Sequence, residues 1–218
     1  MKSILSTTLL FVLFSVYGQE KKVRFGLQAF PNFSTGIPKS GTPSSEYYKG
    51  IETFTFSYSA GIQIELNVGE KWKSSNGFLY KTVGERGKTI PNDPNRGFLY
   101  PMEYGFKLGY LELQINMQRK FGENWFLEFG VSPSYMISAK YGVERDQYFM
   151  ELGTQYRNSF ALNCNLGFGY ATKVGIVDLK FLPYAQYDPL IAVKEFFPSH
   201  GFPDMNFFAV GIRTIATL

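Results

Sequence analysis

Residues 54–68 read FTFSYSAGIQIELNV, and apolar side chains alternate here with polar or small ones without a slip. The apolar set is Phe54, Phe56, Tyr58, Ala60, Ile62, Ile64, Leu66 and Val68. A period of two predicts a β-strand with one apolar and one polar face. At about 3.3 Å per residue the strand is roughly 50 Å long. Even when tilted by about 45°, it crosses a hydrocarbon core of about 30 Å, so we expect one wall strand of a transmembrane β-barrel.

Seven further segments have the character of strands. We expect them at residues 22–32, 78–88, 100–121, 125–139, 159–170, 177–186 and 205–218. The segment 78–88 alternates poorly, and its pattern does not define which side chains share a face.

Two irregularities are expected within these strands. The apolar phase of Phe106 and Leu108 is opposite to that of Leu111, which predicts a β-bulge near Gly109–Tyr110. A proline cannot donate a hydrogen bond to a ladder, so we also expect a local irregularity at residue 133.

The connections between these strands alternate in length. Long connections are expected at residues 34–50, 89–97, 141–153 and 189–204, and short ones at 69–77, 121–124 and 172–175. This layout is typical of outer-membrane barrels. Trp72 and Trp125 lie at short turns, where an interfacial aromatic girdle is expected. The sequence therefore predicts an all-β fold, an eight-stranded antiparallel up-and-down transmembrane β-barrel with long external loops and short periplasmic turns.

The N-terminus has the features of a secretory signal peptide. Lys2 supplies a positive charge, residues 4–16 are mostly apolar, and Gly18 offers a small residue before a cut. We expect residues 1–18 to be a cleaved signal peptide and residues 19–218 to be the barrel domain. No cysteine follows the apolar run directly, so a lipoprotein anchor is not indicated. The predicted location is the bacterial outer membrane.

Composition narrows the expected partners. Charged residues make up 18% of the chain, whereas about 25% is usual for soluble domains. The net charge of +4 is spread along the chain, so nucleic acid is not implied as a partner. The expected partners are outer-membrane lipid and the barrel assembly and export machinery. Cys164 is the single cysteine, so no intramolecular disulfide can form.

Several charged residues fall on the polar faces of the strands. They are Arg24, Glu65, Glu112, Glu128, Asp178, Lys180 and Arg213. These charges could line a small pore. Alternatively they form a closed network of pairs, because side chains fill a barrel of about eight strands. We favour the closed network, and a half-paired one would be energetically costly in a dry interior.

Catalytic chemistry has little support in the sequence. His200 and Ser199 suggest a base and a nucleophile for lipid hydrolysis, but neighbours in sequence rarely meet in that way and no orienting acid is identifiable. We expect His200 to be a solvated loop residue. Cys164 lies on an apolar face, where a buried and inert thiol is expected.

Metal and phosphate sites are also not indicated. His, Cys and carboxylate side chains are not clustered at ligand spacing. Asp93, with its asparagine neighbours, fits a turn better than a calcium loop. Residues 167–169 (GFG) are not followed by Gly-Lys-Ser/Thr, so we expect these glycines to relieve crowding in a curved wall. We predict no catalytic residue, cofactor or metal site.

Three short motifs carry a resemblance to a known family. They are YLEL at residues 110–113, GFLY at 77–80 and GIR at 211–213. With them the chain resembles the PorT-like outer-membrane β-barrel (porin) family of Bacteroidota. Two residues depart from the family pattern: Gln114 stands where proline is usual, and Leu218 stands where an aromatic residue commonly helps the assembly machinery to recognise the chain. The resemblance implies a fold and a location, but no activity.

The long loops are the remaining candidates for function. Tyr47, Tyr48, Phe196 and Phe197 could meet an extracellular or periplasmic protein or a glycan, or they could pack on the barrel rim. We expect a non-enzymatic outer-membrane barrel with a structural or interaction role through its external loops. The alternatives are a narrow porin-like channel for small solutes, an enzyme that modifies envelope lipids, and a soluble lipocalin-like carrier.

Overall fold

A computed structural model describes residues 23–38, 54–89, 102–143, 149–190, 192–194 and 204–218. The strands are β1 (Val23–Pro38), β2 (Thr55–Asn67), β3 (Trp72–Thr89), β4 (Met102–Phe121), β5 (Trp125–Val143), β6 (Phe149–Glu151), β7 (Phe160–Val174), β8 (Val177–Tyr187) and β9 (Met205–Thr217). A short 3₁₀ turn, Thr154–Tyr156, precedes β7. Within the described residues, no helix is long and apolar enough to span a bilayer.

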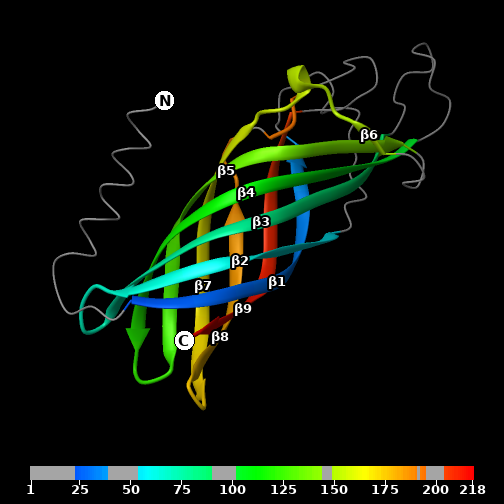
Figure 1. Ribbon diagram of the computed structural model, residues 1–218. Coiled ribbons are helices and arrows are strands. Elements are labelled where there is room, and N and C mark those ends of the chain that lie inside the picture. Colours follow the sequence, from blue (N-terminus) through cyan, green and yellow to red (C-terminus); the bar gives the residue numbers. More distant parts are fainter. Residues whose placement is uncertain (1–22, 39–53, 90–101, 144–148, 191, 195–203) are drawn as a thin grey trace, which may run out of the picture.

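Eight long strands form one closed antiparallel sheet (Figure 1). Each pairs with its neighbours in the order β4-β3-β2-β1-β9-β8-β7-β5, and pairing between β4 and β5 completes the ring. The three-residue strand β6 only extends one end of β5. The eight-stranded antiparallel up-and-down barrel predicted from the sequence is therefore confirmed.

The two ends of the barrel differ. Residues 68–71, 122–124 and 175–176 connect strands at the end that we call the short-turn end. The strand ends that the other connections join, such as Pro38 of β1 and Thr55 of β2, lie at the opposite end, which we call the long-connection end (Figure 1). The structure begins β3 at Trp72, so the first short turn is tighter than the predicted residues 69–77.

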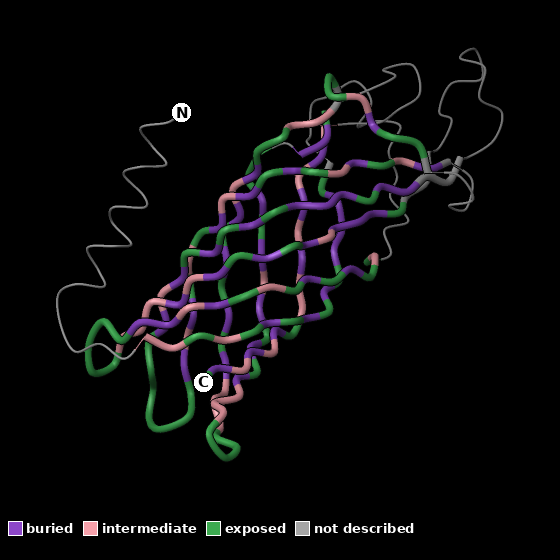
Figure 2. Tube along the Cα trace, viewed as in Figure 1, coloured by how far each residue is buried: buried purple, intermediate pink, exposed green. Residues whose placement is uncertain are grey.

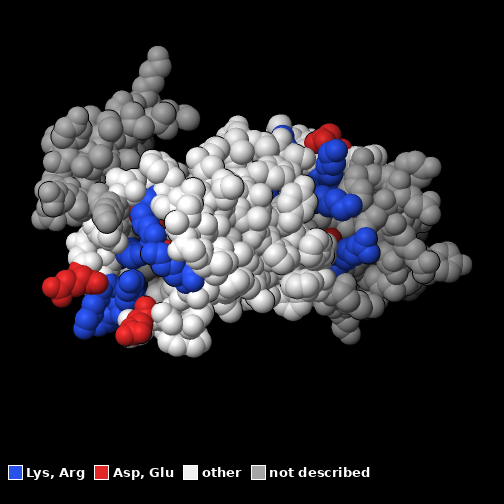
Figure 3. Space-filling view, turned by 60° about the horizontal axis from the view of Figure 1, so that its bottom comes forward, with Lys and Arg blue, Asp and Glu red and all other residues white. Residues whose placement is uncertain are grey.

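The apolar faces of the strands point outward. Ile62, Leu113 and Phe129 are 53%, 40% and 41% exposed, whereas Gln63 and Glu112 beside them are buried. Figure 2 shows the same alternation of buried and exposed positions along the barrel wall. Leu66 of β2 is an exception, because it belongs to the apolar face of the strand but is buried. Charged side chains gather toward the two ends of the barrel on the face shown in Figure 3. A wide apolar band therefore surrounds the molecule, as a membrane-spanning barrel requires.

Aromatic rings border this band at the short-turn end. Trp125 is half exposed and stacks on Phe168 at 5.3 Å between ring centroids. The Arg119 guanidinium lies 5.6 Å from the ring centre of Trp72. Aromatic rings with an apolar body and a polar tip favour the boundary between lipid tails and water. The rings and cations thus lie where an interfacial girdle is expected.

The predicted bulge occurs at the predicted level, but in the neighbouring strand. The β4–β5 register shifts between Gly109, which pairs with Ser138, and Tyr110, which pairs with Met136. The β-bulge predicted near Gly109–Tyr110 is therefore confirmed in position, but its extra residue is Ile137 of β5 rather than a residue of β4. β4 keeps the same alternation throughout, and its inward residues Phe106, Leu108, Tyr110 and Glu112 are all buried. The sequence pattern shifts only because the inward residues change there from apolar to polar. After the bulge, Ala139 points into the lumen and is buried.

Pro133 interrupts the ladder on one side, as expected. The β4–β5 pairs pass from Glu112–Ser134 to Ile115–Val131 without a pair for the proline. On its other side Pro133 pairs with Leu162 of β7. The missing N–H is thus accommodated without breaking the strand.

Glycines permit close approach inside the curved wall. A Cβ at Gly169 would lie 2.4 Å from the Phe126 ring, which fits the expected relief of crowding. A Cβ at Gly61 would lie 2.2 Å from the carbonyl oxygen of Phe78 and 2.6 Å from the Leu79 Cα. Backbone atoms of a paired strand cannot move aside easily, so Gly61 is the more restrictive position.

We expect Gly61→Ala to destabilise the barrel by about 1–3 kcal/mol, as overpacking of a rigid site does. Urea unfolding from lipid vesicles would measure the change. Gly69→Ala is the matched control, because nothing lies within 4 Å of a Cβ there. An equal loss of stability in both variants would contradict this account.

Candidate functional site: the filled lumen

Along β4 the lumen side chains change from polar near the short-turn end to apolar near the long-connection end. The division is not strict on other strands, since Phe126 is buried near the short-turn end and Ser34 and Glu85 are buried toward the other end. The inward positions of β4 show the change along one strand: Gln118, Asn116, Gln114 and Glu112 are followed by Tyr110, Leu108 and Phe106, and all are buried. The period of two determines which way a side chain points and not whether it is polar, so polar and apolar residues can both occupy the inward face.

Glu112 is the centre of one polar cluster. Its Oε2 accepts hydrogen bonds from Gln186 Nε2 at 3.0 Å and from Asn163 Nδ2 at 3.3 Å. Lys81 Nζ lies 3.5 Å from the same oxygen and donates to Gln186 Oε1 at 2.5 Å. Lys81 and Glu112 are 3% and 0% exposed, so the pair is shielded from solvent.

Glu128 is the centre of a second cluster. Arg213 Nη1 donates to its Oε1 at 2.5 Å, and the side-chain amides of Asn116 and Gln118 donate at 2.9 and 2.7 Å. The Arg213 guanidinium also lies 5.2 Å from the Phe30 ring centre and 5.0 Å from that of Tyr184. Arg213 is only 1% exposed. Charge pairing, hydrogen bonds and aromatic faces together compensate for its burial.

A third cluster joins Lys180 to Glu65. The Lys180 ammonium donates to the Glu65 carboxylate, and also to Gln118 Oε1 at 2.9 Å. Gln63 Nε2 donates to Glu65 at 3.1 Å. Lys73 approaches the same carboxylate at 3.8 Å. Gln118 contacts both Lys180 and Glu128, so the second and third clusters are continuous.

Arg24 and Asp178 lie apart from these clusters. They pair with each other at the short-turn end, where their side chains are 24% and 22% exposed. The structure therefore brings Glu65, Glu112, Glu128, Lys180 and Arg213 of the predicted set into the deep lumen and places the other two at its rim.

Two further charged residues of the lumen, Lys81 and Glu85, were not predicted from the sequence. Both are buried on the inward face of β3. That face also carries Leu79 and Val83, so it has no polar period that could have revealed its charges. Only the register of β3 against its neighbours identifies them.

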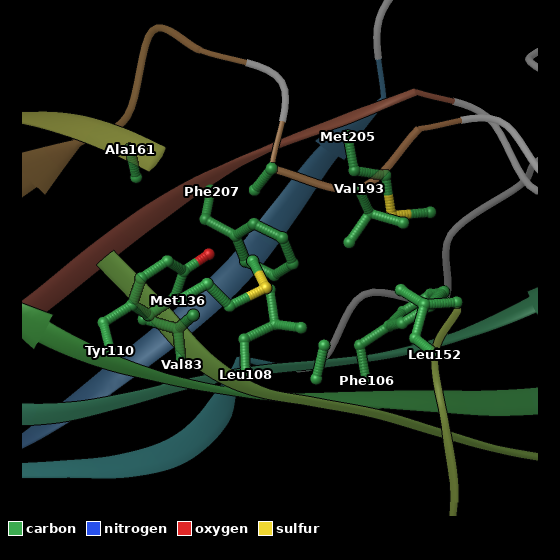
Figure 4. Packing of buried hydrophobic residues seen from close by; sticks show 12 residues of the cluster. Val83, Phe106, Leu108, Tyr110, Met136, Leu152, Ala161, Val193, Met205 and Phe207 are labelled. Carbon is green, nitrogen blue, oxygen red and sulfur yellow. The ribbon is translucent and has the colours of Figure 1, made fainter. Parts of the chain in front are cut away.

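The apolar cluster closes the other half of the lumen (Figure 4). Its members are Val83, Phe106, Leu108, Tyr110, Met136, Ala139, Leu152, Ala161, Ala192, Val193, Met205 and Phe207. Leu152 follows β6, and Val193 lies in the connection between β8 and β9, so segments outside the wall contribute to it. Leu152 N donates to Ala139 O at 2.8 Å, and Met205 N donates to Val193 O at 2.8 Å. These bonds hold the two segments across the barrel opening.

The other predicted positions divide into two groups. Tyr47, Tyr48, Asp93, Phe196, Phe197, Ser199 and His200 lie outside the described residues, as do residues 1–18. Cys164 is exposed on the outward face of β7, so the expectation of a buried thiol was wrong for the isolated barrel. Outward residues of this strand face lipid rather than a protein core. Among the described residues, no three His, Cys, Asp or Glu side chains are grouped so as to hold a metal ion.

Comparison with known proteins agrees with the fold. Neisserial surface protein A is 12% identical, with a TM-score of 0.49, and the match covers 89% of this chain and 97% of that one. Ail, the attachment invasion locus protein of Yersinia pestis, is 9% identical, with a TM-score of 0.50 and coverage of 90% and 99%. No curated protein sequence matches the chain. Residues 17–189 match the model of the outer membrane protein beta-barrel domain. The chain belongs to this outer membrane protein beta-barrel domain family.

Proposed function

We propose that this outer-membrane barrel is non-enzymatic and non-conducting, and that it has a structural or interaction role through its external loops. The observation that carries the proposal is the filled lumen. A scaffold that is closed inside leaves its lipid-facing band and its two ends as the surfaces that can meet partners.

An ion crossing the lumen would have to pass two different barriers. It would first separate buried charge pairs such as Lys81–Glu112 and Arg213–Glu128, which costs several kcal/mol for each charge left uncompensated. It would then cross a zone packed by the apolar cluster, which includes Leu108 and Phe207, and entering it would cost the ion its hydration. These two barriers in series favour the closed barrel over the narrow channel.

The finer family assignment is also a proposal. The motif residues 110–113 place Leu111 and Leu113 outward and Glu112 in the lumen. The closing motif 211–213 places Arg213 beside Glu128. Both motifs thus hold residues with defined places in the barrel wall and lumen, which supports membership of the PorT-like group of Bacteroidota. We also propose export through a cleaved signal peptide at residues 1–18. Outer-membrane lipid and the barrel assembly and export machinery are the proposed partners.

A partner of the external loops is the remaining part of the proposal. Tyr47, Tyr48, Phe196 and Phe197 are the aromatic residues that we assign to contact with a protein or a glycan. Loops on a rigid scaffold often carry function, and the closed barrel provides such a scaffold.

Conductance across planar bilayers tests the proposal. The reconstituted wild-type protein is expected to give no steady current above that of the bare bilayer, while a porin inserted under the same conditions gives discrete steps. Reproducible steps from the wild type, altered in size by Arg213→Met, would favour the channel. Lipid hydrolysis that disappears in His200→Ala would instead favour the enzyme.

A further inference from the structure

A small pocket lies at the short-turn end, directly beside the third charge cluster, whose Lys73, Gln118 and Lys180 contribute to its lining. Its volume is about 150 Å³. Four lysines line it, namely Lys73, Lys120, Lys173 and Lys180. Thr172 and the ring of Phe126 contribute to the same wall. One water molecule needs only about 10–15 Å³ of such space, so the pocket has room for one small hydrated ion.

The strand phases show which way this pocket opens. Lys73 lies two residues before buried Ser75 on β3, and Lys120 lies two residues after buried Gln118 on β4. Lys173 continues the inward series of β7 that includes buried Asn165. Side chains two residues apart share a face of a strand. The lysines therefore surround the barrel axis at its opening, rather than facing the lipid.

The charges around the pocket do not balance. Two acidic residues, Glu123 and Asp178, line it beside the four lysines. Lys180 is engaged by Glu65, and Asp178 is engaged by Arg24. In the described part of the chain, Lys120 and Lys173 have no ion-pair partner. Lys and Arg side chains lie at this end of the molecule together with Asp and Glu side chains (Figure 3). Positive charge thus exceeds negative charge in a concave space, which concentrates the field on whatever enters it.

We propose that this pocket binds a small, multiply charged oxyanion of the phosphate class, which enters along the barrel axis from the periplasmic side. Lysine ammonium groups are compact charges with three donors each, and they bind phosphate as point charges. A doubly charged oxyanion can contact Lys120 and Lys173 together, whereas a single carboxylate neutralises only one of them. The Phe126 ring lies 5.5 Å below the Lys180 ammonium and forms the apolar floor of the site.

Calorimetric titration of the folded barrel in detergent micelles with inorganic phosphate tests the site, with sodium chloride at matched ionic strength as the reference. Saturable binding is expected. The double variant Lys120→Gln/Lys173→Gln is expected to weaken it about tenfold, as the loss of two partly screened charge contacts implies. Both lysines are exposed, so folding is expected to be retained and can be checked by circular dichroism.

Lys194→Gln is the matched control, because Lys194 is exposed, lies in the connection between β8 and β9 at the long-connection end, and does not line the pocket. Its affinity for phosphate is expected to stay within about twofold of the wild type, since a distant exposed charge is screened. Absence of saturable binding, or equal weakening in the control, would overturn the proposal.

The source of the anion is tested in lipid nanodiscs. Phosphate binding is expected to be equal in discs of phosphatidylcholine and of phosphatidylglycerol. Loss of binding only in phosphatidylglycerol discs would mean that lipid headgroups occupy the site, and would overturn axial entry. None of these readouts depends on whether the barrel conducts.

Discussion

Replacing Arg213 by methionine is expected to lower the free energy of unfolding by about 3–5 kcal/mol, the usual effect of removing one partner of a buried ion pair. Glu128 would keep the amide donors of Asn116 and Gln118 but would lose its only cation within the described lumen contacts. A carboxylate that is 1% exposed has little access to water to replace that cation. The faces of Phe30 and Tyr184 would also lose their contact with the guanidinium.

Urea unfolding from lipid vesicles, followed by tryptophan fluorescence, measures this loss. The double variant Arg213→Met/Glu128→Gln removes both charges and keeps an acceptor for one amide, so it is expected to recover much of the stability. Arg24→Met is the matched control at the partly exposed rim, where an ion pair contributes about 0–1 kcal/mol. If the double variant were no more stable than the single one, an uncompensated charge would not be the cause.

Ile62→Arg is expected to destabilise the barrel by about 2–4 kcal/mol, the depth-dependent effect of arginine on the lipid face near the bilayer midplane. Ile62 is half exposed and pairs with Leu27 on β1 and Phe78 on β3. Those neighbours are 68% and 49% exposed, so an arginine at this position is surrounded by lipid-facing side chains.

Val68→Arg is the control for depth. Val68 is also about half exposed but lies just beyond β2 at the short-turn end, where the expected effect is about 0–1 kcal/mol. Unfolding of both variants from the same vesicles gives the comparison. Equal losses at the two positions would show that exposure alone, and not lipid depth, determines the effect.

The outer face of the barrel could be predicted from the sequence because lipid imposes one rule along every strand. Each outward residue must be apolar over the membrane span, so the period of two survives in β2, β4 and β7. Residues 54–68 showed this most clearly. The short turns at residues 122–124 and 175–176 could be recognised for a related reason, since the apolar pattern stops on both sides of them.

The inner face could be predicted only in part, because a filled lumen accepts any side chains that pack or pair. Glu112 and Arg213 stood out as polar residues between apolar ones. Leu79, Phe106 and Leu108 point inward although they are apolar, and this led to the wrong strand for the bulge. The apolar cluster joins segments more than 100 residues apart in sequence, so no local pattern could indicate it.

The pairing of β9 with both β1 and β8 has a consequence for biogenesis. A chain that stops before Met205 leaves two strands with rows of unsatisfied N–H and C=O groups, which are open edges prone to aggregation. Lipid tails cannot hydrate such groups, so a partial sheet is not viable within the bilayer. Delivery of the final strand must therefore coincide with, or precede, the release of the cylinder into the membrane.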